Sequence, residues 1–596
     1  MKSPIEILEE KISAAMAAAA GQRNYPAMVT PATDAKFGDY QSNGIMALAR
    51  ELKTNPRKLA ENVVKRLNVT DICESPEIAG PGFINLKLKA DFVANSLLAL
   101  YRDPENRLAI DKTTVPKTIV VDFSGPNIAK QMHVGHLRST IIGDSICRML
   151  EFLGHKVIRQ NHIGDWGLQM GMVVYSIETN IDKYFYKPGE RFVDQDLNRV
   201  PDLDTLERYY KEISVLAEHD ADIADAVHDC TVRLQRGGSF AKSYWEHAQK
   251  ITLEACYDLY RLLNVNLNEK HTRGESFYKN MLVEVVSDLQ KQGLAEKSDD
   301  AVCIFPEGFK NKDGQLLPLI IQKSDGAYLY ATTDLAAIRY RVGKLKVDRI
   351  IYVTDARQKL HFEMLFAVAK MAGWVKDQTE LIHVTFGSVL GDNGKPLKTR
   401  TGENVKLKEL LDEAVERAKQ TVEEKNPELS PDKKEKIAKT VGIGAVKYAD
   451  FSNNRTSDYI FSFDKMLAME GNTAPYMQYA YARIKSIERR GQLDIEKELA
   501  DVAKLNLTET AELDLAKYLI RYGRAINAAI ADYRPNYLTS YLYELAQKFS
   551  VFYTNCPVLT AKPNKRPTRL LLCDLTAKTI KHGLSELLGI EVVEQM

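Results

Sequence analysis

Residues 118–161 read TIVVDFSGPNIAKQMHVGHLRSTIIGDSICRMLEFLGHKVIRQN, and this stretch decides the fold. Its apolar start, Thr118 to Phe123, predicts a buried strand, and an apolar helical face begins near Val134. Gly154 stops the helix, and Lys156 to Asn161 predicts the next parallel strand. A strand, a loop, a helix and a parallel strand make up half of a nucleotide-binding α/β domain.

The loop ends in His133-Val134-Gly135-His136, directly at the start of the predicted helix. Two imidazoles three residues apart lie on one side there, beside free backbone N–H groups and the positive end of the helix dipole. Gly135 lets a nucleotide approach the backbone closely. We therefore predict a phosphate site. Without this context such a pair of histidines is better explained as having no role, and a metal site is disfavoured because the helix offers no third ligand nearby.

Outside this stretch, the chain divides into segments of different character. A capping box, Ser3-Pro4-Ile5-Glu6, opens an α+β domain over residues 1–112. A Rossmann-type α/β core is predicted over 113–465, with a helical insertion at about 170–300, and an all-α helical bundle over 466–596. Further core strands are expected at Leu317–Ile321, Tyr328–Tyr330, Arg349–Thr354 and Leu381–Phe386.

The composition is that of an ordinary globular protein, with 45% hydrophobic and 27% charged residues. The net charge of +1 does not itself indicate nucleic acid, so such a partner would need local basic patches. No apolar run is long enough to span a bilayer, and the first residues lack the apolar region of a signal peptide. The seven cysteines form no C-x-x-C pair. We therefore expect reduced thiols, a cytoplasmic protein and no zinc.

Several motifs in chain order carry a resemblance to a known family. They are Asp122-Phe123-Ser124, the stretch Pro126 to Thr140, Asn161-His162-Ile163-Gly164-Asp165-Trp166-Gly167, Tyr328 to Asp334, and Glu470 to Ala480. In these motifs the chain resembles the arginyl-tRNA synthetases of class I, and the likeness covers nearly its whole length. The resemblance implies a monomer that activates L-arginine with ATP and Mg²⁺ and then loads tRNA(Arg). It also suggests that tRNA is needed before arginine is activated.

The family's second signature, KMSKS, is altered in this chain. Gly394-Lys395-Pro396-Leu397-Lys398-Thr399-Arg400-Thr401-Gly402 stands at the matching place. Many arginyl enzymes share this loss, and a lysine before the first signature, here Lys130, is implied to compensate. Phosphate contact is expected for Lys398 and less so for Arg400, while the alternative is a solvated loop.

The reaction needs donors rather than a catalytic triad. The arginine carboxylate that attacks the α-phosphate is already ionised at neutral pH, so positioning and charge neutralisation must supply the rate. We expect His133, His136, Lys130 and Lys398 to be catalytic, with Gly135 and Arg400 also contacting ATP.

Selecting arginine requires a carboxylate that pairs with a planar guanidinium. Asp334 is the best candidate, with Tyr330 beside it, although Asp334 is also explained as a helix N-cap. The resemblance adds Gln358 at the side-chain pocket. It places Asp122, Ser124 and Asn127 near the amino and carboxylate ends of the substrate.

Transfer RNA contacts are expected in both terminal domains. The resemblance implies Phe37, Tyr40, Gln41 and Asn43 in the N-terminal domain, which contacts the tRNA elbow, although Phe37 could equally be core. In the anticodon-binding bundle it implies Tyr476, Gln478 and Arg483. The basic loop Lys562 to Arg569 is a further candidate for phosphate contact, although such loops are usually only solvated.

Three alternatives remain open on the sequence. A binding or regulatory relative that has lost catalysis would explain the altered second signature, but the intact His133, His136, Lys130 and Asp334 disfavour it. A small nucleotidyltransferase can share the histidine motif but lacks the two terminal domains. A class I synthetase for another amino acid is disfavoured by Asp334 and by the lack of a large editing insertion.

Overall fold

The computed structural model describes residues 2–21, 25–185, 201–235, 239–398 and 403–596. Two compact units are present. The central unit comprises Thr113–Ala468 and Glu586–Ile590, and the terminal unit comprises Met1–Lys112, Met469–Ser585 and Glu591–Met596.

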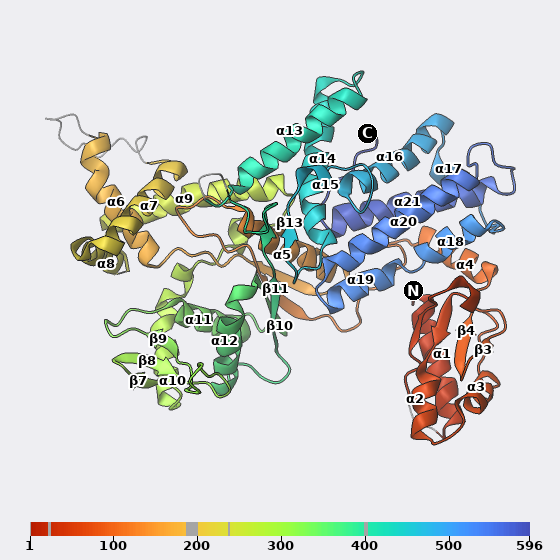
Figure 1. Ribbon diagram of the computed structural model, residues 1–596, viewed down its shortest axis with the longest axis horizontal. Coiled ribbons are helices and arrows are strands. Elements are labelled where there is room, and N and C mark those ends of the chain that lie inside the picture. The colour runs from red at the N-terminus through yellow and green to blue at the C-terminus, as the bar shows by residue number, and fades with distance from the viewer. Residues whose placement is uncertain (1, 22–24, 186–200, 236–238, 399–402) are drawn as a thin grey trace. The chain divides into compact units, whose positions relative to one another are not determined.

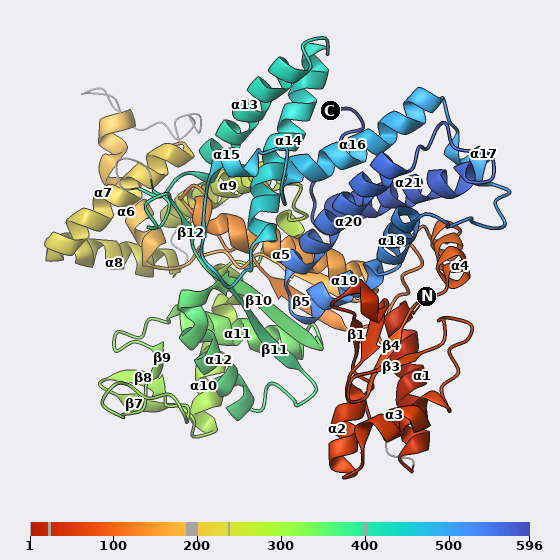
Figure 2. The same cartoon turned by 45° about the vertical axis from the view of Figure 1, so that its right-hand side comes forward.

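A four-stranded parallel sheet forms the middle of the central unit. It consists of β5 (Thr118–Asp122), β6 (Lys156–Gln160), β10 (Arg349–Asp355) and β11 (Glu380–Phe386), in the spatial order β11-β10-β5-β6 (Figure 2). The chain moves from β5 to β6 on one side, and β10 pairs with the other side of β5. The crevice beyond the carboxyl ends of β5 and β10 is therefore the topological switch point, where α/β sheets of this kind bind ligands.

The predicted strand, loop and helix of this sheet are confirmed. Ile119, Val120 and Val121 are fully buried, as expected for a parallel strand covered on both faces. Helix α5 (Val134–Phe152) follows and is buried along nearly its whole length (Figure 1). A Cβ atom at Gly143 would collide with the Phe123 side chain, so the close approach of α5 to the end of β5 requires glycine.

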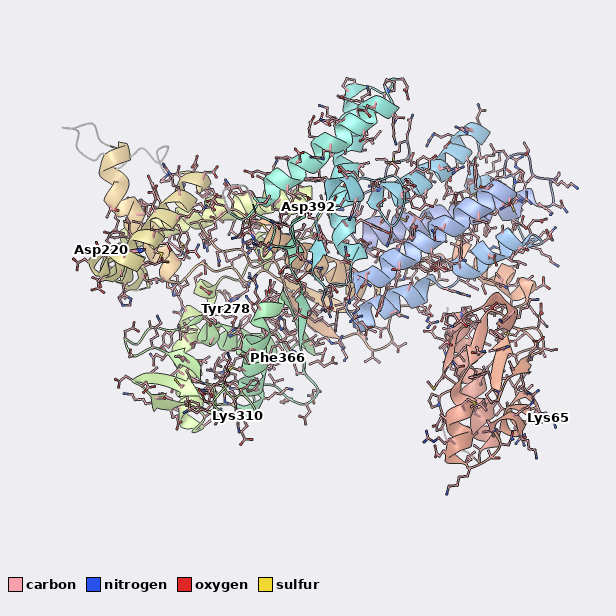
Figure 3. All side chains as sticks on the ribbon, viewed as in Figure 1. Lys65, Asp220, Tyr278, Lys310, Phe366 and Asp392 are labelled. Atoms are coloured by element: carbon pink, nitrogen blue, oxygen red, sulfur yellow. The ribbon has the colours of Figure 1, made fainter. Side chains whose placement is uncertain are left out.

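An apolar core joins the sheet to the helices that follow it in the chain. It includes Tyr278 and, at its edge, Phe366, both labelled in Figure 3. The elements are α10 (Leu282–Lys291), β7 (Glu296–Ser298), β8 (Ala301–Ile304), β9 (Leu319–Gln322), α11 (Tyr330–Gly343) and α12 (Lys359–Met371). The strand predicted at Tyr328–Tyr330 is wrong, because α11 begins at Tyr330. The Thr332 N–H already donates to the Leu329 carbonyl, so tertiary packing overrides the β propensity of these aromatic residues.

Four helices of the insertion pack against one another (Figure 1). They are α6 (Leu168–Phe185), α7 (Leu203–His219), α8 (Ala221–Gln235) and α9 (Ser239–Leu262). Later in the chain, α13 (Leu407–Lys425) and α14 (Pro431–Ser452) form a long antiparallel pair. Two short strands, β12 (Val389–Leu390) and β13 (Tyr459–Ile460), and helix α15 (Phe463–Met466) complete the unit.

The terminal unit combines an antiparallel sheet with a helical bundle. Its sheet has the order β1-β2-β4-β3, and the Ser3–Glu6 capping box is present at α1. The elements of the N-terminal part are α1 (Pro4–Ala19), β1 (Val29–Pro31), β2 (Tyr40–Ser42), α2 (Gly44–Glu51), α3 (Pro56–Val64), β3 (Glu77–Ala79), β4 (Phe83–Leu86) and α4 (Ala90–Tyr101). The bundle comprises α16 (Ala474–Gly491), α17 (Ile495–Leu499), α18 (Thr510–Leu519), α19 (Tyr522–Ala531), α20 (Pro535–Asn555) and α21 (Arg566–Lys581). Among the described helices of both units, none is long and apolar enough to cross a membrane.

Candidate active site

The loop after β5 brings the first signature to the switch point. Ser124 turns the chain with a φ of 76°, which is unfavourable for a residue other than glycine. Its N–H donates to Ser139 Oγ at 2.9 Å, and its hydroxyl bonds Tyr260 Oη at 2.7 Å. Ser124 is 7% exposed, so its hydroxyl stabilises the turn. The expected substrate contact of Ser124 stays a prediction, and in this structure its hydroxyl is bonded to Tyr260 and Thr140.

His133 and His136 cap the start of α5 reciprocally. Gly135 N–H donates to His133 Nδ1 at 3.0 Å, and His133 N–H donates to His136 Nδ1 at 3.1 Å. This is the geometry of a capping box with imidazoles in place of the usual hydroxyl and carboxyl groups. Because both Nδ1 atoms accept hydrogen bonds, each neutral ring carries its proton on Nε2. The two Nε2–H groups are thereby available as donors at the helix start.

The surroundings keep both rings neutral. Burial lowers the pKa of His136 to about 3, and the neighbouring His133 and Lys130 lower it as well. Burial also lowers the pKa of His133, helped by Lys130 and Arg357 and opposed by Glu207. The site thus combines cations and neutral imidazole donors with the positive end of the α5 dipole, which suits a polyphosphate. The N–H groups of Val134, Gly135 and His136, which were expected to be free, are already bonded within the protein.

Replacing His136 with glutamine should weaken the acid sensitivity of the fold. The pKa of His136 falls from 6.5 to about 3 on folding. Unfolding between those pH values takes up a proton, so this contribution to stability is complete above pH 6.5 and is lost as the pH falls. The loss amounts to at most about 1.4 kcal/mol per pH unit. Glutamine keeps the acceptor of the cap without titrating. Thermal unfolding at pH 7 and pH 5 should show a smaller drop in midpoint for the variant; equal drops would contradict the assignment.

The second signature reaches the same end of the sheet. Lys398 forms an antiparallel bridge with Asn404, and Lys406 forms one with His133. Val134 N–H donates to the Val405 carbonyl at 3.0 Å. The structure therefore brings the segment around Lys398 toward the first signature. Arg400 lies outside the described residues.

Asp122, at the end of β5, is held inside the protein. Its Oδ2 accepts from Arg341 at 2.6 Å, and its Oδ1 accepts from the His162 N–H at 3.3 Å. Asp122 is 8% exposed and Arg341 is completely buried. The paired carboxylate joins β5, the loop after β6 and α11. Asp122 therefore links His162 to α11, and its expected contact with substrate stays a prediction.

A second cluster surrounds Asp334 on α11. His361 Nε2 lies 2.8 Å from Asp334 Oδ2, and His162 Nε2 lies 3.8 Å from Oδ1. The Asp334 side chain remains 18% exposed. Tyr330, one turn earlier and 63% exposed, has its ring 5.0 Å from that of His361. Asp334 is the fifth residue of α11, not its N-cap, so the N-cap explanation is excluded.

Glu275 is a site residue that the sequence analysis missed. Burial raises its pKa, His162 opposes this, and Asp165 and Asp334 raise it further. Glu275 and Asp334 therefore lie close enough for their charges to interact, which favours a cationic ligand beside them. No sequence motif marks Glu275, which follows the helical insertion. His162 lies in the Asn161–Gly167 motif, but no role was predicted for it. Asn127 and Gln358 are exposed in the loops after β5 and β10.

Several of the expected tRNA contacts are already used within the terminal unit. Tyr40 is 1% exposed beneath Arg521, and Gln478 is fully buried with its amide donating to the Glu591 carbonyl. Arg483 lies over the Tyr553 ring, at 4.4 Å. The expected tRNA contacts of Tyr40 and Gln478 stay predictions, and both side chains are buried in this structure.

The polar candidates of the N-terminal domain bond to neighbours but keep some exposure. Gln41 donates to Asn85 at 2.8 Å and Asn43 donates to Thr30 at 3.3 Å. Phe37 is partly exposed under the Lys36 amino group, at 4.9 Å. Tyr476, also partly exposed, has its ring 5.8 Å from that of Tyr543. These four residues therefore remain candidates.

The basic segment 562–569 is a loop only up to Lys565, because α21 begins at Arg566, and most of its cations are paired within the protein. Lys565 bonds Glu509, and Arg566 lies 3.7 Å from Glu498. The Arg569–Glu512 pair, at 2.7 Å, is almost completely buried. Arg569 is therefore a structural residue, which corrects its place among the candidates for phosphate contact.

The fold and this site define a class I aminoacyl-tRNA synthetase. The family described as tRNA synthetases class I (R), catalytic domain, matches residues 102–463. The DALR anticodon binding domain matches 477–596, and the arginyl tRNA synthetase N terminal domain matches 6–88. The chain belongs to the arginyl-tRNA synthetase family.

Individual relatives agree over the full length. The chain is 47% identical to an arginine–tRNA ligase of Synechococcus sp., with 100% of both chains covered. It is 46% identical to the arginine–tRNA ligase of Hahella chejuensis, with 99% of each covered. The crystal structure of arginyl-tRNA synthetase from Plasmodium falciparum superposes with a TM-score of 0.83 at 32% identity, covering 100% of both chains. The Thermus thermophilus arginyl-tRNA synthetase shares the fold, with a TM-score of 0.80 at 24% identity over 99% of this chain and 100% of that one.

Proposed function

We propose that this chain joins L-arginine to tRNA(Arg) in two steps that use ATP. The observation that carries the proposal is the pairing of two sites at one end of the sheet. The two imidazoles cap the start of α5, where we propose the anion site. The Asp334 carboxylate bonds His361, and there we propose the guanidinium site, with Glu275 as a second carboxylate. Together they suit a substrate that brings a polyphosphate next to a planar cation.

In the first step the arginine carboxylate attacks the α-phosphorus of ATP and pyrophosphate leaves. The Nε2–H groups of His133 and His136 and the amino group of Lys130 stabilise the negative charge that develops on the phosphate oxygens. The histidines act as neutral N–H donors and the lysine acts as a cation, so this step needs no proton transfer to or from them at pH 7. Mg²⁺ bound with ATP would neutralise part of the phosphate charge, and Lys398 adds positive charge from the second signature.

Arginine is recognised through its guanidinium. Asp334 accepts two of its N–H groups, Glu275 supplies the second negative charge, and the exposed Tyr330 ring packs against the aliphatic stem. Lysine offers a smaller, rounder cation that leaves one carboxylate oxygen unpaired. Asn127 and Gln358 stay candidates for the substrate's polar ends.

In the second step a ribose hydroxyl at the 3′ end of tRNA attacks the arginyl-adenylate, and AMP leaves. Class I membership favours the 2′-hydroxyl. Phe37, Gln41, Asn43, Tyr476 and Arg483 are the proposed tRNA contacts. We further propose a cytoplasmic monomer in which bound tRNA(Arg) is required for the first step.

Exchange of labelled pyrophosphate into ATP tests the activity directly. The assay is run with each of the twenty amino acids, with and without bulk tRNA. Arginine alone should support exchange, and only when tRNA is present. Exchange driven equally by lysine would overturn the assignment of the guanidinium site, whereas strong exchange without tRNA would overturn only the tRNA requirement. No exchange under any condition, with ATP binding intact, would favour a relative without catalytic function.

A further inference from the structure

Helix α7 of the insertion lies against the residues that precede the first signature. The Lys130 amino group sits 4.0 Å from the centre of the Tyr210 ring. The next backbone N–H, of Gln131, is 3.4 Å from a Glu207 carboxylate oxygen, and the Gln131 side chain bonds Asp204. Asp204, Glu207 and Tyr210, on two successive turns of one helix, thus face the loop that ends in the two histidines.

The same helix also contacts the segment that follows the second signature. Lys406 Nζ lies 2.8 Å from Asp204, and Lys211 Nζ lies 2.9 Å from Glu403. This segment is hydrogen-bonded to the first signature, because Leu407 N–H donates to the Met132 carbonyl at 2.9 Å. Asp204 therefore accepts from both segments, through Gln131 and Lys406.

The ion pairs alone do not fix the position of Lys130. Asp204 is 67% exposed and Glu403 is 57% exposed, and exposed pairs of this kind contribute little. The contact to Tyr210 differs, because it is made to the amino group of Lys130 itself by a partly buried ring. A lysine side chain loses about 2 kcal/mol of rotamer entropy when it is ordered, so a partner that orders it beforehand favours its later contact with a ligand.

We propose that Tyr210 is a positioning residue that sets the place of Lys130 at the ATP phosphates. The inference rests on the proposed function, in which Lys130 replaces the charge lost from the second signature. Tyr210 touches no substrate and acts through Lys130. The helical insertion is thereby part of the activation machinery, because its face carrying Asp204, Glu207 and Tyr210 aligns both signature segments.

Two substitutions at Tyr210 separate the ring from the hydroxyl. Tyr210→Leu removes the ring face and should lower kcat/KM for ATP in the exchange reaction about 3- to 30-fold, the range expected for a cation–π contact. The KM for arginine should stay unchanged, because the guanidinium site is separate. Tyr210→Phe keeps the ring face and should restore most of the loss. Val215→Ala, at a 60% exposed position of α7, is the matched control for the helix.

A Lys130→Ala background distinguishes failure of the inference from failure of the proposed function. Exchange by Lys130→Ala at the wild-type rate would overturn the role of Lys130 and the inference with it. If Lys130→Ala is impaired, Tyr210→Leu should cause no further loss in that background. An additional loss of the same size, or faster exchange in the single Tyr210→Leu variant, would overturn the positioning role alone.

Discussion

Replacing Asp334 with asparagine should lower kcat/KM for arginine in the exchange reaction by a few hundred- to several thousandfold. The Asp334 side chain is only 18% exposed. In the variant, a guanidinium bound beside it would lose its bidentate partner. Truncating one partner of such a desolvated pair costs about 3–5 kcal/mol. Asparagine keeps the size of the side chain and still offers an oxygen to His361. The measurement is exchange as a function of arginine concentration.

The same series tests whether Asp334 and Glu275 act as one acidic site. Burial raises the pKa of Glu275, and Asp334 contributes to this. Removing the charge of Asp334 should therefore ionise Glu275 more completely and leave some affinity for arginine, which the Asp334→Asn, Glu275→Gln double variant should lose. Asp325→Asn is the matched control, because this exposed aspartate accepts a hydrogen bond from the Ala327 backbone N–H and lies on the loop before α11. Near-normal exchange by Asp334→Asn would remove the assignment.

The framework of the catalytic core could be predicted because its signals are local. The run Thr118 to Phe123 is apolar at four of its six positions, and α5 has a wide apolar face, so neither signal depends on distant partners. The strand proposed at Tyr328–Tyr330 is reduced to a single bridge between Tyr328 and Gln322 at the end of β9, because the chain enters α11 at Tyr330. Packing in this part of the chain instead begins a helix.

The chemistry of the site could be predicted only in part. The role of the two histidines could be predicted from their position at the start of a helix. Their reciprocal capping and their neutral state could not, because both depend on atomic geometry. Asp334 interacts with side chains from three different elements, namely Glu275, His162 and His361. A single sequence does not show that residues so far apart in the chain come together.

In the terminal unit, the sequence likewise did not show which aromatic and basic side chains are buried. Tyr40 and Arg569 have the side chains expected of RNA contacts, yet both complete the interior of the unit. An aromatic ring or a guanidinium can either pack in the interior or contact RNA. Only the burial of the side chain in the structure distinguishes these two roles.

Replacing Asp450 with leucine should destabilise the central unit by about 3–5 kcal/mol. Arg138 on α5 and Asp450 on α14 form an ion pair at 3.0 Å, and each side chain is 1% exposed. Arg138 also donates to the carbonyls of Gly387 at 2.7 Å and Ser457 at 3.1 Å. The variant leaves a buried guanidinium without its counterion. The measurement is the midpoint of the thermal transition that ATP raises, because a ligand that binds the folded unit identifies that transition.

The pair holds the helix that carries the first signature, and a double variant separates charge from shape. An Arg138→Met, Asp450→Leu protein has no isolated charge, so it should recover much of the stability lost by the single change. Asp412→Ala is the control, because its pair with Lys408 is more than half exposed on both sides and should contribute under about 1 kcal/mol. If Asp450→Leu shifts the midpoint no more than this control, Asp450 does not stabilise α5. If the double variant recovers stability but not exchange, the hydrogen bonds from Arg138 to Gly387 and Ser457 are what align α5 with the second signature.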